Sequence, residues 1–313
     1  MKKSKKIILS AVAIIVLVGV GAFSYTVFQL SKISTVKIAR TNEELGINPQ
    51  LVEKEEEEEV SEIINIALFG VDRRTKEEAS RSDSMIILSI DTANKKIKMS
   101  SIMRDTYVQI KGHGETKINH AYAYGGPQLA IRTLNENFNL DIRDYVTVDF
   151  TNLEKIIDAI DGVTVNIEQD EIKLVPGVTK SGTQTLNGKQ AVEYSRIRHT
   201  TGNDFRRTER QRTVLAVIFT KIQSIGVTDF PAIVSELLPL TETSMNSIDL
   251  IKLGTKVLTS NTKELEQERF PVDGYWSGKT MDGVWYLLAD MESTKEQLHD
   301  FIYEDKKPVP KSN

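Results

Sequence analysis

Residues 63–71, Ile-Ile-Asn-Ile-Ala-Leu-Phe-Gly-Val, form a near-continuous apolar run of strand length in this chain of 313 residues. A strand that is covered on both faces has this pattern, because neither face carries the polar residues that alternate along a half-exposed strand. Two further apolar runs, at 85–90 and 97–102, follow after short polar segments. The three runs together predict a buried central sheet.

Helical and strand patterns alternate along the rest of the chain. The predicted helices cover residues 127–138, 152–159, 208–225, 231–238, 248–258 and 294–303, and the further strands cover 145–150, 163–167 and 283–288. Such alternation is typical of an α/β protein with a mixed sheet and helices on both faces.

Charged residues follow or precede each of the first three strands. Asp72 ends the first strand, Asp83 precedes the second, and Arg104 and Asp105 follow the third. Ligands of open α/β sheets bind at strand ends, so this repetition predicts a binding site there.

Six arginines lie within residues 196–212, although the net charge of the chain is −4. The planar guanidinium fork suits phosphate and pyrophosphate oxygens. Arg196 and Arg198 would share one face of an extended segment, and Arg207 and Arg210 would share one face of a helix, so both pairs are expected to converge on one anion. The alternative is a solvated basic surface.

Composition excludes several classes of function. The acidic net charge argues against a broad nucleic-acid-binding surface, so the arginine cluster must be a local site. The chain has no cysteine, which excludes cysteine nucleophiles, thiolate metal sites and disulfides.

The N-terminal region predicts export and anchoring. Four lysines in residues 1–6 precede residues 7–30, which carry no charge and would span roughly 36 Å as a helix. We expect a cytoplasmic tail (1–6), a transmembrane helix (7–30), an acidic extracellular linker (31–62), a catalytic domain (63–305) and a C-terminal tail (306–313). The predicted location is the cell membrane, as a single-pass protein with the domain on the cell-wall side. The alternative for 7–30 is a cleaved signal peptide.

Six motifs occur in order along the domain. They are Leu-Phe-Gly-Val-Asp-Arg-Arg (68–74), Arg-Ser-Asp-Ser-Met (81–85), Ser-Ile-Met-Arg-Asp-Thr (101–106), Lys-Ile-Asn-His-Ala-Tyr-Ala-Tyr-Gly-Gly (117–126), Leu-Asn-Gly-Lys-Gln-Ala (186–191), and Tyr-Ser-Arg-Ile-Arg through Asp-Phe-Arg-Arg-Thr-Glu-Arg-Gln-Arg (194–212). In these motifs the chain resembles the LytR-CpsA-Psr family of bacterial envelope proteins.

The resemblance implies a three-layer α/β/α sandwich with a mixed central sheet. It also implies transfer of a glycan, as a phosphodiester, from a polyprenyl-pyrophosphate carrier to peptidoglycan, which attaches teichoic acid or capsular polysaccharide. The lipid bilayer, the lipid-linked glycan and the peptidoglycan acceptor are then the expected partners, with no nucleic acid.

The resemblance also assigns roles to residues. Asp72 and Asp83 match ligands of a divalent ion, Mg²⁺ or Mn²⁺. The expected pyrophosphate-binding residues are Arg74, Arg81, Arg104, Arg196, Arg198, Arg207, Arg210 and Gln211. The expected catalytic residues are Arg104, Asp105, Arg196, Arg198, Asp204 and Arg207, with Asp105 and Asp204 both open as the general base. The chain departs from the family pattern at Met103, where proline is common, and at Arg206, where glycine is usual.

The sequence leaves three alternatives open to the site roles and the transfer reaction given above. Neighbouring Asp and Arg residues can be structural ion pairs. The same residues would serve a pyrophosphatase, in which water replaces the sugar acceptor. A membrane-anchored regulator, of the transcriptional attenuator type, would bind the lipid-linked glycan without turnover, although the sequence shows no helix-turn-helix with a basic recognition face.

Overall fold

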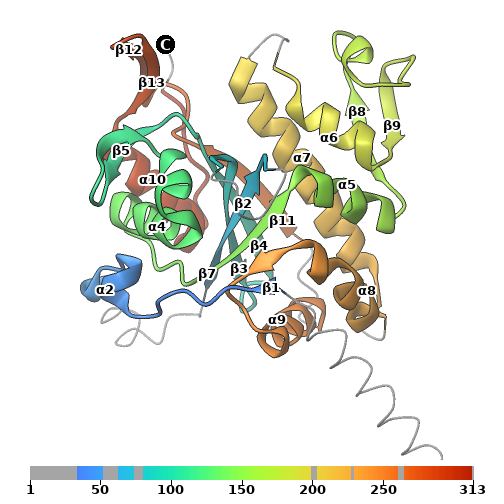
Figure 1. Cartoon of the computed structure of the whole chain (residues 1–313), viewed down its shortest axis with the longest axis horizontal. Helices are drawn as coiled ribbons and strands as arrows, with labels where there is room; N and C mark the ends of the chain where they lie inside the picture. Colours follow the sequence, from blue (N-terminus) through green and yellow to red (C-terminus); the bar gives the residue numbers. More distant parts are fainter. Residues whose placement is uncertain are drawn as a thin grey trace, which may run out of the picture.

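A mixed sheet forms the centre of the protein in the computed structural model, which describes residues 34–51, 63–73, 80–198, 203–226, 229–259 and 264–311. Its strand order is β1-β10-β7-β2-β3-β4-β11 (Figure 1). The strands are β1 (Ser34–Thr35), β2 (Ile64–Val71), β3 (Ser82–Asp91), β4 (Lys96–Ile102), β7 (Asp144–Asp149), β10 (Glu242–Thr243) and β11 (Glu264–Phe270). β3 is antiparallel to β2 and β4, whereas β7 pairs with β2, and β11 with β4, in parallel. The predicted mixed sheet is confirmed.

Helices cover both faces of this sheet. On one face, Ala67 and Phe69 of β2 pack in one buried cluster with Leu134 of α4 (His120–Phe138) and Phe301 of α10 (Met291–Tyr303). On the other face, Ile66 packs with apolar residues of α7 (Asn203–Ser224) and α9 (Ser247–Thr259). Both faces of β2 are therefore buried, which explains its near-continuous apolar sequence.

A peripheral lobe stands beside the sheet with a buried cluster of its own. It contains α5 (Phe150–Ala159), the hairpin β8 (Val163–Ile167) and β9 (Gly182–Leu186), the 3₁₀ turn η1 (Ile172–Leu174) and α6 (Gly188–Arg196). Apolar residues of these elements pack against α7 and α8 (Phe230–Leu237), which leads into the 3₁₀ turn η2 (Leu238–Leu240). The lobe thus carries α6 and the start of α7 toward the sheet.

Two further hairpins complete the fold. They are β5 (Tyr107–Ile110) with β6 (Gly114–Lys117), and β12 (Trp276–Met281) with β13 (Val284–Ala289). Figure 1 shows the β12–β13 hairpin and the β8–β9 hairpin at the same end of the molecule, on opposite sides of the central sheet.

The folded domain begins earlier than predicted. Residues 34–51 belong to the fold, since Ser34 pairs with Glu242 in the sheet and Leu45 of α2 (Asn42–Leu45) is completely buried. The expected linker 31–62 is therefore corrected for residues 34–51. The sequence did not indicate this part of the fold, because a two-residue strand and a single-turn helix leave no periodic pattern. The expected tail is also docked as far as Lys311, whose N–H donates to the Asp273 carbonyl at 3.1 Å.

The predicted transmembrane helix at 7–30 and the glutamate run at 53–59 lie outside the described residues. Within the ranges that the structure describes, no helix combines the length and the apolar composition needed to cross a bilayer.

Candidate active site

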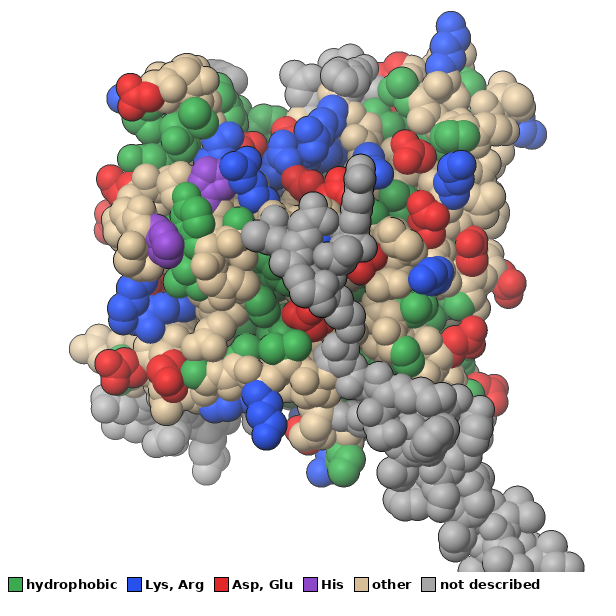
Figure 2. Space-filling view, viewed as in Figure 1, with side chains coloured by type: hydrophobic (Ala, Val, Ile, Leu, Met, Phe, Trp, Pro, Cys, Tyr) green, Lys and Arg blue, Asp and Glu red, His purple; other side chains and the backbone are tan. Residues whose placement is uncertain are grey.

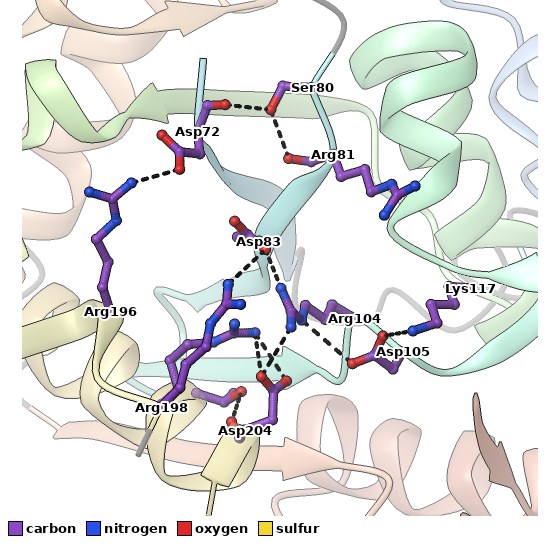
Figure 3. Close-up of polar contacts among 12 residues, drawn as sticks. Asp72, Ser80, Arg81, Asp83, Arg104, Asp105, Lys117, Arg196, Arg198 and Asp204 are labelled. Carbon is purple, nitrogen blue, oxygen red and sulfur yellow. Dashed lines mark hydrogen bonds and ion pairs between the residues drawn. The ribbon is translucent and has the colours of Figure 1, made fainter. Parts of the chain in front are cut away.

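The charged residues at the strand ends come together at one edge of the sheet. Because β3 runs antiparallel to both β2 and β4, the ends of β2 and β4 lie beside the start of β3. Asp72 follows β2, Asp83 lies at the start of β3, and Arg104 and Asp105 follow β4 (Figure 3). The structure thus brings these strand ends together at one edge of the sheet, as the predicted site requires.

The motif at residues 186–191 fixes the start of α6. Asn187 caps the helix by accepting from the Gln190 N–H at 2.9 Å, and the Gln190 side chain accepts from the Asn187 N–H at 3.1 Å, which forms a capping box. A Cβ at Gly188 would lie 2.1 Å from the Glu154 carbonyl oxygen, so only glycine lets α6 pass this close to α5. The close crossing places Arg196, the last residue of α6, over the sheet edge.

Two adjoining cavities open at this edge. The smaller, of about 180 Å³, is lined by Asp72, Asp83, Phe150, Arg196, Arg198, Arg207 and Gln211. The larger, of about 410 Å³, is lined by Asp72, Ser80, Arg81, Asp83, Arg104, Asp105, Lys117, Asn119 and Arg198. Cationic side chains outnumber carboxylates in both linings, which favours an anionic ligand. Figure 2 shows Lys and Arg side chains gathered beside acidic ones in the upper middle of this face.

Arginines from the peripheral lobe reach the carboxylates of the sheet. Arg196 donates to Asp72 at 2.6 Å, and its guanidinium lies 4.5 Å from the centre of the Phe150 ring. Arg198 lies 4.0 Å from Asp83, which also accepts a short hydrogen bond from Arg104 (Figure 3). These contacts join the sheet to the end of α6 through side chains that line one or both of the cavities.

Arg207 is the most buried cation of the site, with a side chain only 2% exposed. It pairs with Asp204 at 2.8 Å, while its Nε and Nη1 atoms have no hydrogen-bond partner within the described chain. Burial lowers the pKa of Arg207 to about 10, despite the opposing effect of Asp204. Because buried donors are normally satisfied, two unpaired nitrogens in a residue that lines a cavity make Arg207 a candidate partner for the acceptor oxygens of a ligand.

Arg104 is held by three carboxylates. Burial alone would lower its pKa, but Asp204, Asp83 and Asp105 outweigh that effect and raise the pKa of Arg104. Asp105 in turn forms a 2.6 Å ion pair with Lys117 of β6. The network fixes the Arg104 guanidinium at the wall of the larger cavity.

Most predicted site residues are brought together, with two exceptions, Arg210 and Arg74. Arg210 does not line either cavity: its Nε donates to Glu171 at 2.6 Å, and both side chains are almost fully buried in the peripheral lobe. Its assignment to the pyrophosphate site is therefore corrected. Arg74 lies outside the described residues. Arg196 ends a helix rather than standing in an extended segment, although it and Arg198 still meet at the smaller cavity.

The two departures from the family pattern do not enter the cavities. Arg206 forms a short ion pair with Glu168 and lies 3.6 Å from Glu209, so it faces the β8–β9 side of the lobe. Met103 is buried, and its sulfur accepts from the Thr208 hydroxyl at 3.7 Å. Met103 thus packs β4 against α7.

Four cavity residues were not predicted as site residues: Ser80, Lys117, Asn119 and Phe150. Lys117 and Asn119 lie in one of the motifs quoted above, so the signal was present in the sequence. Phe150 carried no signal, because an aromatic residue after a strand is usually part of the core.

The donor chemistry of the site fits a hard divalent cation. Asp72 and Asp83 line both cavities, and in the described chain only one oxygen of each carboxylate accepts a hydrogen bond from an arginine. Mg²⁺ typically uses one or two carboxylates together with phosphate oxygens and waters. The described residues contain no cluster of three or more His, Cys, Asp or Glu side chains suited to a metal ion, so ligand oxygens would have to complete such a site.

Comparisons with known proteins find similarity over most of the chain. The model of the LytR_cpsA_psr family matches residues 24–301. "Polyisoprenyl-teichoic acid--peptidoglycan teichoic acid transferase TagU" from Oceanobacillus iheyensis is 36% identical over 243 residues, which cover 73% of this chain and 72% of TagU. "Regulatory protein MsrR" from Staphylococcus aureus is 33% identical over 246 residues, covering 77% of this chain and 75% of MsrR. A structure of YwtF (TagT) with bound octaprenyl pyrophosphate lipid superposes with a TM-score of 0.60 at 26% identity, covering 77% of this chain and 90% of TagT.

Proposed function

This chain belongs to the LytR-CpsA-Psr family, and from that premise we propose that it is a phosphotransferase that moves a phosphoglycan from a polyprenyl-pyrophosphate carrier to peptidoglycan. The glycan is of the teichoic acid or capsular polysaccharide type. The names of TagU, a teichoic acid transferase, and of the lipid-bound TagT structure support the reaction and the carrier.

One observation carries the proposal: Asp72 and Asp83 from the sheet share a cavity with Arg196 and Arg198 at the end of α6 and with Arg207 on α7. Phosphoryl transfer needs little covalent help from a protein. It needs the phosphates to be held in position and the developing charge to be neutralised. A ring of guanidinium groups does both, and the unpaired Nε and Nη1 of Arg207 supply donors for phosphate oxygens.

In the proposed step, a sugar hydroxyl of peptidoglycan attacks the phosphorus atom that bears the glycan. The new P–O bond forms the phosphodiester, and the bond from that phosphorus to the bridging oxygen of the pyrophosphate breaks. Polyprenyl phosphate leaves with that oxygen, and the hydroxyl proton passes to a carboxylate of the site.

We assign Asp105 as the base that accepts this proton. Asp105 lines the larger cavity, whereas Asp204 is outside the lining of both and pairs with Arg104 at 3.2 Å and with Arg207 at 2.8 Å. Asp204 is thus placed to orient two arginines. Asp105→Asn is expected to lower kcat while lipid-pyrophosphate affinity is retained, and Asp204→Asn is expected to weaken that affinity. The opposite pattern would reverse the two roles.

A Mg²⁺ or Mn²⁺ ion held by Asp72 and Asp83 is part of the proposal. Bound there, it would neutralise phosphate charge that the two carboxylates otherwise repel. The support is the donor chemistry and the position of both carboxylates in both cavities.

The location is proposed from the sequence. Residues 7–30 are long and apolar enough to anchor the chain, and the lysines before them favour a cytoplasmic N-terminus. The domain would then stand on the cell-wall side, where peptidoglycan is available.

The test uses the full chain in detergent micelles with a lipid-linked glycan and soluble peptidoglycan fragments, and identifies the products by mass. A glycan joined to the fragment through a phosphodiester is the expected product. Free phosphoglycan together with polyprenyl phosphate would instead establish the pyrophosphatase alternative. Binding with no product would favour the regulatory alternative, which the name of MsrR keeps in view.

A further inference from the structure

The β12–β13 hairpin is attached directly to the proposed base. The Leu287 N–H of β13 donates to the Asp105 carbonyl at 2.9 Å. The neighbouring Tyr286 ring lies 5.7 Å from Nζ of Lys117, the cation that pairs with the Asp105 carboxylate. The hairpin therefore contacts two residues, Asp105 and Lys117, that line the larger cavity.

The hairpin is rich in aromatic side chains. Trp276 contacts Phe205 at the start of α7, with ring centres 4.8 Å apart, and Phe205 immediately follows Asp204. Trp285 is 41% exposed. Its indole lies against Gly278 of the opposite strand, because a Cβ there would be only 2.8 Å from the indole nitrogen. Glycine at this position lets the indole lie along the hairpin while a large part of its surface stays open to solvent.

Polar side chains alternate with these aromatic groups. Ser277, Lys279, Thr280 and Asp282 are exposed along the same hairpin. In the hairpin this alternation places Ser277 and Lys279 on the opposite face from Trp276 and Trp285, whereas Thr280 lies beside Trp285 on the same face. The face that carries the two tryptophans is therefore not continuously apolar, as a bilayer surface requires. A saccharide instead combines an apolar face of C–H groups with hydroxyls around its edge. Flat aromatic rings beside small polar groups fit that chemistry, since aromatic side chains provide a large, rigid apolar surface.

Building on the proposed function, we propose that the β12–β13 hairpin is the acceptor subsite, where Trp276 and Trp285 bind the glycan strand of peptidoglycan. The contacts to Asp105 and Lys117 then link acceptor binding to the cavity in which the hydroxyl reacts. Figure 2 shows hydrophobic side chains at the upper left of the molecule, where Figure 1 places this hairpin, next to the cationic region.

The chain offers a direct probe, because its two tryptophans are Trp276 and Trp285. Tryptophan fluorescence of the full chain in micelles therefore reports on this hairpin alone. Titration with soluble, peptide-free glycan fragments of peptidoglycan is expected to change the emission saturably. An unchanged emission would overturn the proposal, and so would a response to phospholipid vesicles without a response to the fragments.

Kinetics give the second readout. Trp285→Ala should raise the KM for the glycan acceptor about ten-fold or more, by analogy with the loss of one stacked aromatic partner, and leave the affinity for the polyprenyl-pyrophosphate donor unchanged. Tyr124→Ala removes another exposed aromatic side chain, on α4, and serves as the matched control with an unchanged KM. Unchanged acceptor KM in both Trp285→Ala and Trp276→Ala would refute the subsite while leaving the transferase intact. Saturable glycan binding without any transfer would instead refute the proposed function and leave the subsite standing.

Discussion

Replacing Arg207 tests the site most sharply, because this side chain is both buried and only partly paired. Arg207→Met removes the guanidinium and keeps most of the volume. Asp204 loses one partner but still pairs with Arg104 at 3.2 Å. The substitution is therefore expected to preserve the fold, because Asp204 keeps Arg104 as a partner and is 24% exposed, so no buried charge is left uncompensated.

The expected loss follows from the unpaired donors. Arg207 has two nitrogens, Nε and Nη1, without a partner in the described chain. A hydrogen bond to a charged group contributes about 1.5–3 kcal/mol, so two bonds to phosphate would contribute about 3–6 kcal/mol at most. Removal of a donor that stabilises developing charge typically costs about 10²–10³ in kcat. We expect Arg207→Met to lower either the affinity for the polyprenyl-pyrophosphate substrate or the turnover by about 10²-fold or more.

Donor binding is measured by titration with a polyprenyl pyrophosphate, and turnover by the mass assay above. The matched control is Arg206→Met, which removes the neighbouring arginine of the same helix. Arg206 pairs with Glu168 and lines neither cavity. Thermal unfolding followed by circular dichroism checks the fold of both variants. Equal losses in the two variants, or wild-type behaviour of Arg207→Met, would refute the assignment of Arg207 to the pyrophosphate.

Three further predictions concern the metal, the peripheral lobe and pH. Chelation with EDTA should stop turnover, excess Mg²⁺ should restore it, and Asp83→Asn should raise the Mg²⁺ concentration needed; activity that persists in EDTA would remove the ion from the proposal. Glu171→Gln should lower the free energy of unfolding by about 3 kcal/mol, because it removes the buried carboxylate that forms a 2.6 Å ion pair with Arg210; a denaturant titration that shows no loss would contradict this. Burial, followed by nearby cationic side chains, lowers the pKa of His120. The unfolded state therefore takes up a proton first, and stability should fall as the pH drops below about 6.5. Thermal melts at pH 7.5 and 5.5 should show a smaller difference in His120→Gln than in the wild type, and an equal difference would assign the pH effect to other groups.

The sheet was predictable because its strands are buried on both faces. The apolar runs at 63–71, 85–90 and 97–102 leave no room for another interpretation, and each is a strand in the structure. The placement of Asp72, Asp83 and Arg104 at one edge followed from the same runs. Strand ends are visible in a sequence whenever apolar residues stop and charged ones begin.

The positions of the arginine side chains were less predictable. Spacing on a helix shows which side chains share a face, but it does not show which residues of other elements that face contacts. Arg207 and Arg210 are three residues apart on α7, yet Arg207 borders the cavity and Arg210 is sealed inside the lobe by Glu171. Glu171 lies far from both in the sequence, in a loop with no periodic signal. Likewise, the capping box of Asn187 and Gln190 begins α6, which continues as far as Arg196, whereas the alternation of Arg196 and Arg198 indicated an extended segment.

The proposed site joins two separately packed parts of the protein. Asp72 and Asp83 rest on the sheet, while Arg196 and Arg207 rest on helices that pack in the peripheral lobe, each part with its own buried cluster. A pyrophosphate bound by Arg196 and Arg207, with a divalent ion between it and the two aspartates, would bridge these two parts. Its departure after reaction would remove this polar bridge and leave the sheet and α7 joined by apolar packing, which includes Met103 and Phe219.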